Sequence, residues 1–180
     1  MSLPEHPKGA LRTGNIADDL AAGQGNLDVI VVSPARPIFE GDAHWVTVPT
    51  WNRVGGGDGR IRRLYGGAPP PERLAVGQLG IWPRHAPIVA ALGSGLLRIG
   101  QGGGKVSRFA VRGGFLKVGD DKVTILVDSA VAEADADAAE AQRDLDETLE
   151  ALRHPRSDEE FAELLDRRAW SESRLKLAGR

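Results

Sequence analysis

Glycine and proline divide this chain at about residue 130. Of the 23 glycines, 22 precede that point and only Gly179 follows it, and of the 11 prolines only Pro155 follows it. Both residues mark turns and are costly inside helices. The distribution therefore predicts short strands joined by tight turns over residues 27–130 and helices over residues 131–180. Residues 1–26 are polar and Gly-rich without periodicity, which predicts a mobile N-terminal extension.

Short β-branched and apolar runs, separated by turn signals, fill much of the strand-rich part. Strands are predicted at residues 27–33, 38–40, 44–48, 96–99, 105–111, 115–118 and 122–127. The Gly41-Asp42 pair is predicted to end the second run as a turn, and the GG and GDD connections are typical of hairpins. Several short strands with close turns indicate an antiparallel sandwich or barrel.

One stretch, from about residue 50 to 76, does not fit this pattern. It contains clustered glycines, a triple proline and arginines, with no sustained period. A structureless stretch of this length inside a compact domain is uncommon and is usually functional or disordered. We therefore predict an insertion between two strands.

Residues 131–180 have helical periodicity. Apolar residues recur at steps of three and four, first at Ala138, Ala141, Leu145, Leu149 and Leu152, and then at Phe161, Leu164, Leu165 and Ala169. His154-Pro155 ends the first helix, because the residue before proline avoids the α region. Ser157 and Glu160 have the spacing of a capping box that starts the second. With so short a connection, the helices either fold back as an αα-hairpin or continue end to end.

Charge is unevenly distributed over these two helices. Residues 133–150 are mainly acidic, whereas residues 167–180 are mainly basic. One interpretation is a solvated face, with acids near one helix start and bases near the other helix end, as the helix dipole prefers. The other is a basic tip that docks onto an acidic surface of a partner.

Composition and motifs exclude several kinds of chemistry. The chain has no cysteine, which removes disulfides and thiol catalysis, and its net charge of −2 gives no general attraction to nucleic acid. The four histidines lack metal-ligand spacing, Gly102–Lys105 lacks the remaining residues of a phosphate loop, and Ser94 is in no nucleophile elbow. No catalytic residue, metal or cofactor is predicted, and a binding or coupling protein is favoured over an enzyme.

No targeting segment is visible either. The apolar runs are far shorter than the roughly 20 residues of a membrane-spanning helix, and the N-terminus has no apolar core of the kind that a signal peptide needs. A cytoplasmic protein is therefore expected.

Four stretches of the strand-rich part resemble, in order, the motifs of one family. They are residues 27–34 with 38–41, 77–88 (GQLGIWPRHAPI), 109–118 (FAVRGGFLKV) and 122–130 (KVTILVDSA). The second is similar to the family's G-E-L-G-I-x-P-G-H-A-P-L, the third to F-A-V-x-G-G-F-x-x-V and the fourth to K-V-T-V-L-A-D-x-A. Followed by a two-helix tail, they resemble the epsilon subunit of F-type ATP synthases.

The resemblance implies a β-sandwich of about ten strands over residues 27–130 and a C-terminal αα-hairpin over residues 131–180. It implies a non-catalytic subunit of the central stalk that binds the gamma subunit and the c-ring, with the alpha and beta subunits as further partners. There it would help couple ion-driven rotation to ATP synthesis. The location implied is peripheral, on the cytoplasmic side of the bacterial inner membrane. In the family, the C-terminal helices can also extend into the catalytic head and restrain ATP hydrolysis.

The resemblance also assigns contact residues. The candidates for the c-ring contact are Gln78, Leu79, Ile81, Arg84 and His85. Gln78 stands where the family usually has Glu, and Arg84 where Gly is usual, so different polar pairs are expected. His85 is either a turn histidine satisfied by backbone groups or a c-ring contact. The insertion at about residues 50–76 either adds a polar contact, to c-ring loops or lipid head groups, or is a free loop.

In the helical part, Arg167, Arg168 and Arg174 are the candidates for contact with an acidic segment of the beta subunit. Some members of the family bind ATP in the hairpin through I/L-D-x-x-R-A. Residues 136–141 match this motif here, with Glu140 in place of Arg, and a carboxylate there would repel phosphate. ATP binding to the hairpin is therefore not expected.

Two other functions are open from the residues alone. One is a stand-alone β-sandwich that binds a small ligand or glycan, with the helices as a dimerisation hairpin. It calls for an aromatic, concave patch, and aromatic residues make up only 5% of the chain. The other is a hydrolase, which needs a nucleophile and a base within reach, and no such motif is present.

Overall fold

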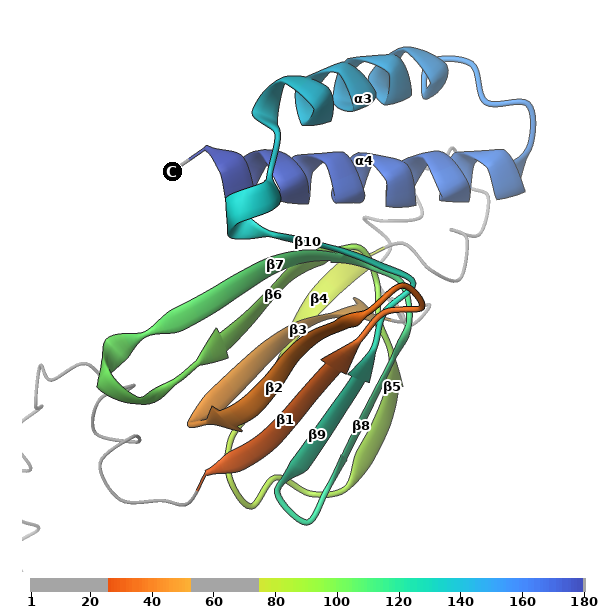
Figure 1. Ribbon diagram of the computed structural model, residues 1–180. Helices are drawn as coiled ribbons and strands as arrows, with labels where there is room; N and C mark the ends of the chain where they lie inside the picture. The colour runs from red at the N-terminus through yellow and green to blue at the C-terminus, as the bar shows by residue number, and fades with distance from the viewer. Residues whose placement is uncertain (1–25, 53–74, 180) are drawn as a thin grey trace, which may run out of the picture.

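The computed structural model describes residues 26–52 and 75–179. Within these residues the chain forms a β-sandwich followed by a hairpin of two helices (Figure 1). The strands are β1 Leu27–Val32, β2 Pro37–Ala43, β3 Trp45–Asn52, β4 Ala75–Ile81, β5 Ile88–Ala91, β6 Gly95–Gly100, β7 Val106–Arg112, β8 Phe115–Gly119, β9 Lys122–Leu126 and β10 Ser129–Ala132. The helices are α3 Ala138–Ala151 and α4 Asp158–Ala178, and the short turns η1 Gly102–Gly104 and η2 Glu133–Asp135 lie between strands or before α3. The expected fold class is confirmed.

The ten strands form two five-stranded sheets. Sheet A has the order β2-β1-β9-β8-β5, and sheet B has the order β10-β7-β6-β3-β4. Neighbouring strands are antiparallel except for β1 and β9, which pair in parallel from Asp28 with Lys122 to Val32 with Leu126. β1 and β9 are thus neighbours in sheet A although they are far apart in sequence. Their pairing joins β2 and β1 to β9, β8 and β5 in one sheet.

The core lies between the two sheets and follows from period-two alternation. In β1, Leu27, Val29 and Val31 are fully buried, whereas Asp28 is exposed. Because successive side chains of a strand point to opposite faces, this alternation places one apolar face inward. The buried cluster is Leu27, Val29, Val31, Ala43, Val46, Val48, Ile81, Leu92, Leu97, Ile99, Phe109, Val111, Leu116, Val118, Val123, Ile125 and Val127. Every member of this cluster belongs to the sandwich.

The strand predictions were accurate in position and incomplete in number. All seven predicted runs are strands, and the GQGGG stretch forms the connection between β6 and β7 that a hairpin needs. The turn predicted at Gly41-Asp42 is wrong, since β2 continues through both residues to Ala43 and pairs with β1 along its length. β4, β5 and β10 were not predicted from periodicity.

Two predictions fall largely outside the described residues. The mobile extension at residues 1–26 is one of them, and the centre of the insertion at residues 50–76 is the other. The ends of that insertion are paired strand, because Trp51 and Asn52 of β3 lie opposite Val76 and Ala75 of β4.

The helices fold back on each other, which resolves the choice left open by the short connection (Figure 1). Half of the predicted capping box is present, since the Ser157 hydroxyl accepts a hydrogen bond from the Glu160 amide at 3.2 Å. The Glu160 carboxylate reaches back one residue farther than the box requires and accepts a hydrogen bond from the Arg156 amide at 2.6 Å. α4 lies between α3 and sheet B, against β6 and β7. The hairpin therefore covers one end of the outer face of sheet B.

Two members of the predicted helical stripe are wrong. Ala138 and Leu149 are exposed, whereas Ala141 and Thr148 of α3 are buried. Each residue turns an α-helix by about 100°, so Thr148 lies within about 20° of Ala141 and Leu149 lies about 80° away. The contact with α4 is centred on the small side chains Ala141 and Thr148 instead of on the leucines.

Candidate functional site

The five residues predicted to contact the c-ring lie on β4, an edge strand of sheet B, and in the loop that follows it. Gln78 is exposed, Leu79 packs against the core, and Ile81 is fully buried within it. This follows from alternation, since Leu79 and Ile81 share the inward face with Val48 and Val46 of β3. Surface for a partner is therefore available at Gln78 and at the loop, and not at Ile81.

The loop between β4 and β5 is fastened to the turn between β8 and β9. The Arg84 amide donates a hydrogen bond to the Asp121 side chain at 2.5 Å. Arg84 has φ of 65°, in the left-handed region where glycine is favoured. An arginine here carries a conformational cost of about 1 kcal/mol or more, and the Asp121 bond offsets part of it. This junction lies at the end of the sandwich farthest from the hairpin (Figure 1).

His85 is held by backbone groups. Its amide donates to the Trp82 carbonyl at 3.1 Å, and its Nδ1 lies 2.7 Å from the Ala86 carbonyl oxygen. Because a carbonyl can only accept, Nδ1 carries a proton in this contact. In the neutral form of imidazole, a proton on Nδ1 leaves Nε2 as an acceptor. The expectation of a turn histidine satisfied by the backbone agrees with this geometry, which fixes the ring orientation for any outer contact.

The rings of two tryptophans lie close against glycines of sheet B. A Cβ added at Gly80 would overlap the Trp82 ring, and one added at Gly100 would overlap the Trp45 ring. Only glycine leaves room for this close approach of a ring to the backbone. The Trp82 ring therefore packs at the edge strand β4, and the Trp45 ring packs over the inner pair β3 and β6.

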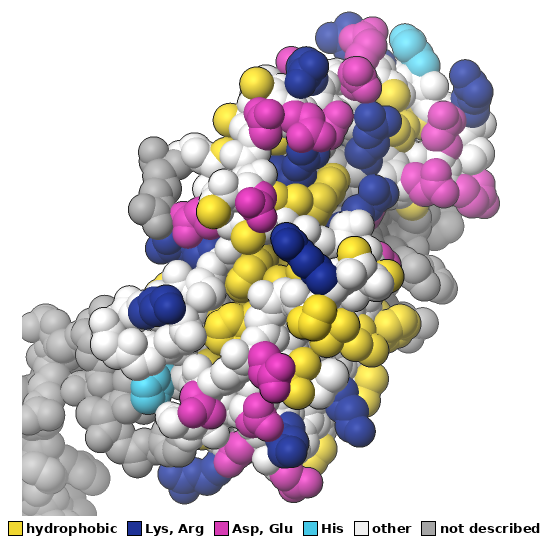
Figure 2. Space-filling model, viewed as in Figure 1, with side chains coloured by type: hydrophobic (Ala, Val, Ile, Leu, Met, Phe, Trp, Pro, Cys, Tyr) yellow, Lys and Arg dark blue, Asp and Glu magenta, His cyan; other side chains and the backbone are white. Residues whose placement is uncertain are grey.

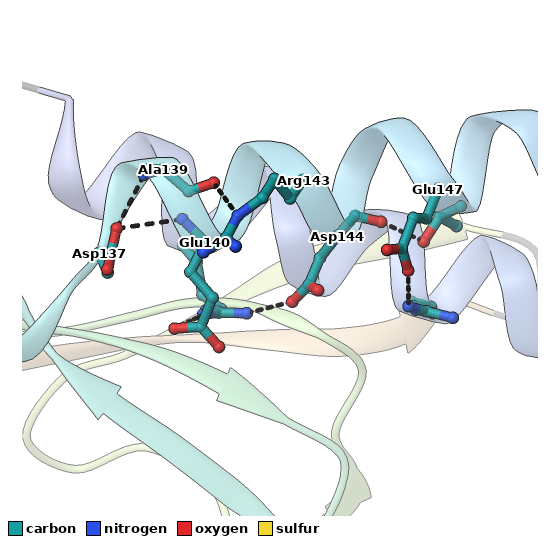
Figure 3. Close-up of polar contacts among 9 residues, drawn as sticks. Asp137, Ala139, Glu140, Arg143, Asp144 and Glu147 are labelled. Atoms are coloured by element: carbon teal, nitrogen blue, oxygen red, sulfur yellow. Dashed lines mark hydrogen bonds and ion pairs between the residues drawn. The ribbon is translucent and has the colours of Figure 1, made fainter.

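The three arginines predicted to contact a partner are all engaged inside the hairpin. Arg167 pairs with Glu147 of α3 at 3.1 Å, and Arg168 pairs with Glu172 of its own helix at 2.7 Å. Arg174 donates a hydrogen bond from Nη1 to Asp144 at 2.7 Å, and its Nη2 forms an ion pair with Glu140 at 2.8 Å. Two of the three, Arg167 and Arg174, thus face acidic residues of α3, a pairing within the hairpin that neither interpretation of the uneven charge predicted (Figure 3).

Arg174 is the most enclosed of these charges. Its side chain is only 8% exposed, and its guanidinium carbon lies 5.8 Å from the centroid of the Trp170 ring. The forked guanidinium can hold two carboxylates at once, which an ammonium group cannot do with the same geometry. We call Arg174, Glu140 and Asp144 the hairpin clamp.

A second polar group joins the hairpin to the sandwich. Asp166 of α4 accepts a hydrogen bond from the Ser94 hydroxyl at 2.7 Å and another from Nε of Arg112 at 3.0 Å. Ser94 lies in the turn before β6 and is almost fully buried, whereas Arg112 ends β7. We call these three residues the latch. Sequence reasoning considered Ser94 only as a nucleophile and missed the latch, because its members come from three separate elements.

Asp137 is the N-cap of α3. Its carboxylate accepts hydrogen bonds from the amides of Ala139 at 2.8 Å and Glu140 at 3.0 Å (Figure 3). These two backbone bonds, with that from Glu140 the larger, lower the pKa of Asp137 below its ordinary value of 3.8. The residue that matches the aspartate of the nucleotide motif is thus used for capping here, and Glu140 is used in the clamp.

An apolar row crosses the outer face of sheet A near the hairpin. Val32, Leu126, Phe115 and Ala91 lie side by side on β1, β9, β8 and β5. Phe115 and Leu126 are well exposed, as is Val89 on the same face. Figure 2 shows hydrophobic side chains gathered in the middle of this view, with charged side chains concentrated over the hairpin and at the far end of the sandwich. Exposed apolar area of this kind is typical of a protein interface.

Two kinds of site are not found in the part of the chain that the structure describes. No group of three or more histidine, aspartate or glutamate side chains there is placed to hold a metal ion. No helix there combines the length and the apolar character needed to cross a bilayer.

Comparison with known proteins gives consistent results. Residues 73–133 match the family described as ATP synthase, Delta/Epsilon chain, beta-sandwich domain. The chain is 35% identical over 157 residues to the ATP synthase epsilon chain of Halalkalibacterium halodurans, an alignment that covers 86% of this chain and 98% of the relative. It is 32% identical over 136 residues to that of Delftia acidovorans, covering 76% and 81%.

A solved structure shares the fold. It is the cryo-EM structure of the Euglena gracilis mitochondrial ATP synthase, OSCP/F1/c-ring in rotational state 1. One of its chains is similar with a TM-score of 0.61 at 18% identity, over 94% of this chain and 87% of that chain. At this identity the likeness concerns the arrangement of sandwich and helices.

Proposed function

The chain belongs to the family of ATP synthase epsilon chains, and from this premise we propose that it binds the gamma subunit and the c-ring in the central stalk. In that position it would help couple ion-driven rotation to ATP synthesis without chemistry of its own. The observation that carries the proposal is the match along 98% of a relative and 86% of this chain, which extends beyond the sandwich alone. Family membership favours this function over the stand-alone ligand module and the hydrolase.

The apolar row of sheet A is the surface that we assign to the gamma subunit. A stalk subunit must hold its neighbour through a full rotation, and burial of apolar area is the main favourable term in such association. Phe115 and Leu126 lie at the centre of the row and expose more than half of their area. The row would be covered by gamma in the assembly.

The opposite end of the sandwich is the surface that we assign to the c-ring. Gln78, Arg84 and His85 are the polar members of the predicted contact set, and the hydrogen bond from Arg84 to Asp121 steadies the loop that carries two of them. Leu79 and Ile81 contribute through packing, since they anchor β4 to the core. We propose a peripheral location on the cytoplasmic side of the bacterial inner membrane, maintained through this contact.

Co-purification tests the proposal. The tagged chain, recovered from its own cells, should bring gamma, alpha and beta subunits with it, as identified by mass spectrometry. Leu126→Asp should reduce the recovery of gamma by tenfold or more. Leu149→Asp is a matched control, because Leu149 is 42% exposed on α3 and Leu126 is 52% exposed in the row. Equal recovery with both variants would exclude the apolar row as the gamma contact, and recovery of no subunit with the unmodified chain would contradict the stalk function.

We further propose that the hairpin restrains ATP hydrolysis when it leaves the sandwich, with Arg167 and Arg168 meeting an acidic segment of the beta subunit. In the folded-back state both are occupied by Glu147 and Glu172. Removal of residues 137–180 tests this, because β10 and η2 end before residue 137 and the sheet is kept intact. Hydrolysis by the catalytic head should rise while stalk assembly persists. Unchanged hydrolysis would mean that the hairpin is no brake.

The hairpin is not proposed to bind ATP. Glu140 places a carboxylate where a phosphate-binding arginine would be needed, and Arg174 is already held by Glu140 and Asp144. Isothermal titration of the full chain with Mg-ATP should detect no submillimolar site. A site of that affinity would overturn this part of the proposal.

A further inference from the structure

The hairpin covers only part of the outer face of sheet B. The polar contacts between α4 and the sheet are at Ser94, just before β6, and at Arg112, the last residue of β7. The other ends of β6 and β7 lead to η1 and project beyond the hairpin (Figure 1). The half of this face nearest η1 is therefore open to another occupant.

A row of residues across this open half carries two arginines side by side. Arg98 of β6 lies opposite Thr47 of β3 on one side and opposite Arg108 of β7 on the other. Arg98 points outward, because Leu97 and Ile99 on either side of it are fully buried in the core. We call Thr47, Arg98 and Arg108 the arginine row. Like charges directly opposite each other destabilise a sheet, so this row favours the approach of carboxylates.

The two arginines differ in how their charge is compensated. Arg108 is 39% exposed and pairs with Glu133 of η2 at 3.4 Å. Arg98 is half-buried and forms no ion pair with any of residues 26–52 and 75–179. A guanidinium bonds most strongly to carboxylates, through charge-assisted hydrogen bonds. The charge of Arg98 is thus available to an acidic segment.

Two tryptophan rings lie close to this row. The Trp45 ring packs against Gly100, two residues after Arg98 in β6, and the Trp82 ring packs against Gly80, which lies opposite Thr47. Trp82 is 44% exposed. Aromatic rings offer apolar area beside the charge, so the face suits a segment that combines carboxylates with aliphatic side chains.

The N-terminal extension contains a segment of this composition. Residues 13–25 include two adjacent acids, Asp18 and Asp19, and no basic residue. Ile16 and Leu20 flank the two acids. The segment therefore complements the open face both in charge and in apolar character.

The point at which the extension joins the sandwich is within reach of the arginine row. Leu27 lies opposite Ala43 at the end of β2, two residues before Trp45, which pairs with β6. With strands about 5 Å apart and a rise of about 3.3 Å per residue, Arg98 lies at most about 25 Å from Leu27. Asp19 precedes Leu27 by eight residues, which span about 26 Å when extended. The arginine and aspartate side chains shorten the gap further.

We propose that the acidic segment at residues 13–25 docks on the arginine row of its own chain, with its two aspartates paired to Arg98 and its two aliphatic side chains against the tryptophan rings. The contact covers the half of sheet B that the hairpin leaves open. It also restrains part of the extension for which the sequence alone predicts mobility. This inference concerns the chain alone and does not rest on the stalk function.

Paramagnetic NMR on the full chain tests the docking, since the absence of cysteine allows a single nitroxide label to be placed in the extension. A nitroxide at Ala17→Cys should broaden the amide signals of Thr47, Arg98 and Arg108 several-fold more than that of Lys117. Lys117 is exposed on the outer face of sheet A, between the buried residues of β8, and reports chance encounters with the rest of the surface.

Arg98→Gln should lower the broadening at Thr47 and Arg108 by about threefold or more, because it removes the charge and keeps most of the side chain. Arg36→Gln is the matched control, since Arg36 is 69% exposed and pairs with Asp135 away from the row. It changes the net charge by the same amount and should leave the broadening unchanged.

The carboxylates can be tested from the other side of the contact. Asp18→Asn together with Asp19→Asn should lower the same broadening by about threefold or more. A salt titration needs no substitution at either surface: near 1 M ionic strength, where the Debye length is about 3 Å, the broadening should fall while the amide spectrum of the core stays unchanged.

Three results would overturn the proposal. If the label broadens the two faces of the sandwich equally, the extension has no preferred surface. If the broadening at the arginine row survives both Arg98→Gln and high salt, the contact does not depend on the proposed charge pair. If nitroxide-labelled chains broaden the row of separate nitrogen-15-labelled chains mixed with them, the occupant is the extension of a second copy.

Discussion

Replacement of Arg174 by alanine should destabilise the hairpin far more than loss of either carboxylate to which it is bound. Arg174 makes one charged hydrogen bond of 2.7 Å, to Asp144, and one ion pair of 2.8 Å, with Glu140, from a side chain that is 8% exposed. Bonds to charged groups contribute about 1.5–3 kcal/mol each. Because Asp144 is partly solvated, we take the low end, about 1.5 kcal/mol, for its hydrogen bond. The ion pair with the more exposed Glu140 and the packing of the arginine stem add about 1 kcal/mol, so the expected loss is about 2–3 kcal/mol.

The exposure of the two acids sets the order of the partner variants. Glu140 is 55% exposed and Asp144 is 34% exposed. Glu140→Gln should therefore cost below about 1 kcal/mol and Asp144→Asn about 1 kcal/mol, since Arg174 keeps one partner in each variant and exposed pairs contribute little. The arginine variant is expected to lose more stability than either acid variant because Arg174 is the member of the clamp that is shielded from water.

Native-state hydrogen exchange is the appropriate assay, because it measures the free energy of local opening for α3 and α4 separately from unfolding of the sandwich. Arg153→Ala, which removes the exposed pair with Glu150, is a control that should change opening by less than about 0.5 kcal/mol. The reasoning is refuted if Arg174→Ala costs no more than this control. It is also refuted if Glu140→Gln costs as much as Arg174→Ala.

Three further predictions concern single positions. Arg84→Gly should change the free energy of unfolding by less than about 1 kcal/mol, because relief of the left-handed strain is offset by greater freedom of the unfolded chain. A sharp fall in the denaturant midpoint would contradict this. Gly114→Ala should lower the free energy of unfolding by about 3 kcal/mol or more, because a Cβ at φ of 107° would overlap the carbonyl oxygen of Leu126. Gly104 has open space around it, so Gly104→Ala should lower the free energy of unfolding by only about 1 kcal/mol, through backbone strain. Thermal denaturation compares the two variants. The N-cap Asp137 has a lowered pKa in the folded state, so its stabilisation of α3 is present above the unfolded-state pKa of 3.8 and is lost as pH falls through the lower folded-state pKa. Hydrogen exchange of the first turn of α3 should show this acid dependence, and Asp137→Asn should abolish it.

Much of the sandwich could be predicted from local patterns. The β-branched run from Leu27 to Val32 and the alternation around Val46 and Val48 report directly which face is buried, and the Gly and Pro distribution separates strands from helices. β5 and β10 have four residues each, too few for a period to stand out. Gly41 and Asp42 were misjudged because their turn preference is overridden by pairing with Val29 and Asp28 of β1.

The polar contacts of the hairpin could not be predicted in the same way. The latch joins Ser94 to Asp166 and Arg112, and these pairs depend on where α4 lies on sheet B, which no local pattern specifies. The clamp depends on the rotation of α3, and the leucine pattern misjudged that rotation by placing Leu149 in the contact. The sequence shows that the two helices carry opposite charge. It does not show whether those charges pair with each other or with a partner protein.

The parallel pairing of β1 with β9 has a consequence for synthesis of the chain. β1 emerges from the ribosome first, yet one of its two neighbours in sheet A begins at Lys122, which pairs with Asp28. Until then the apolar face of Val29 and Val31 has only β2 beside it, and the nascent chain exposes an unpaired strand. Non-local pairing of this kind delays folding and exposes the chain to aggregation. Sheet A can be completed only after β9 has been synthesised, and the hairpin, which follows all ten strands in the chain, then docks on sheet B.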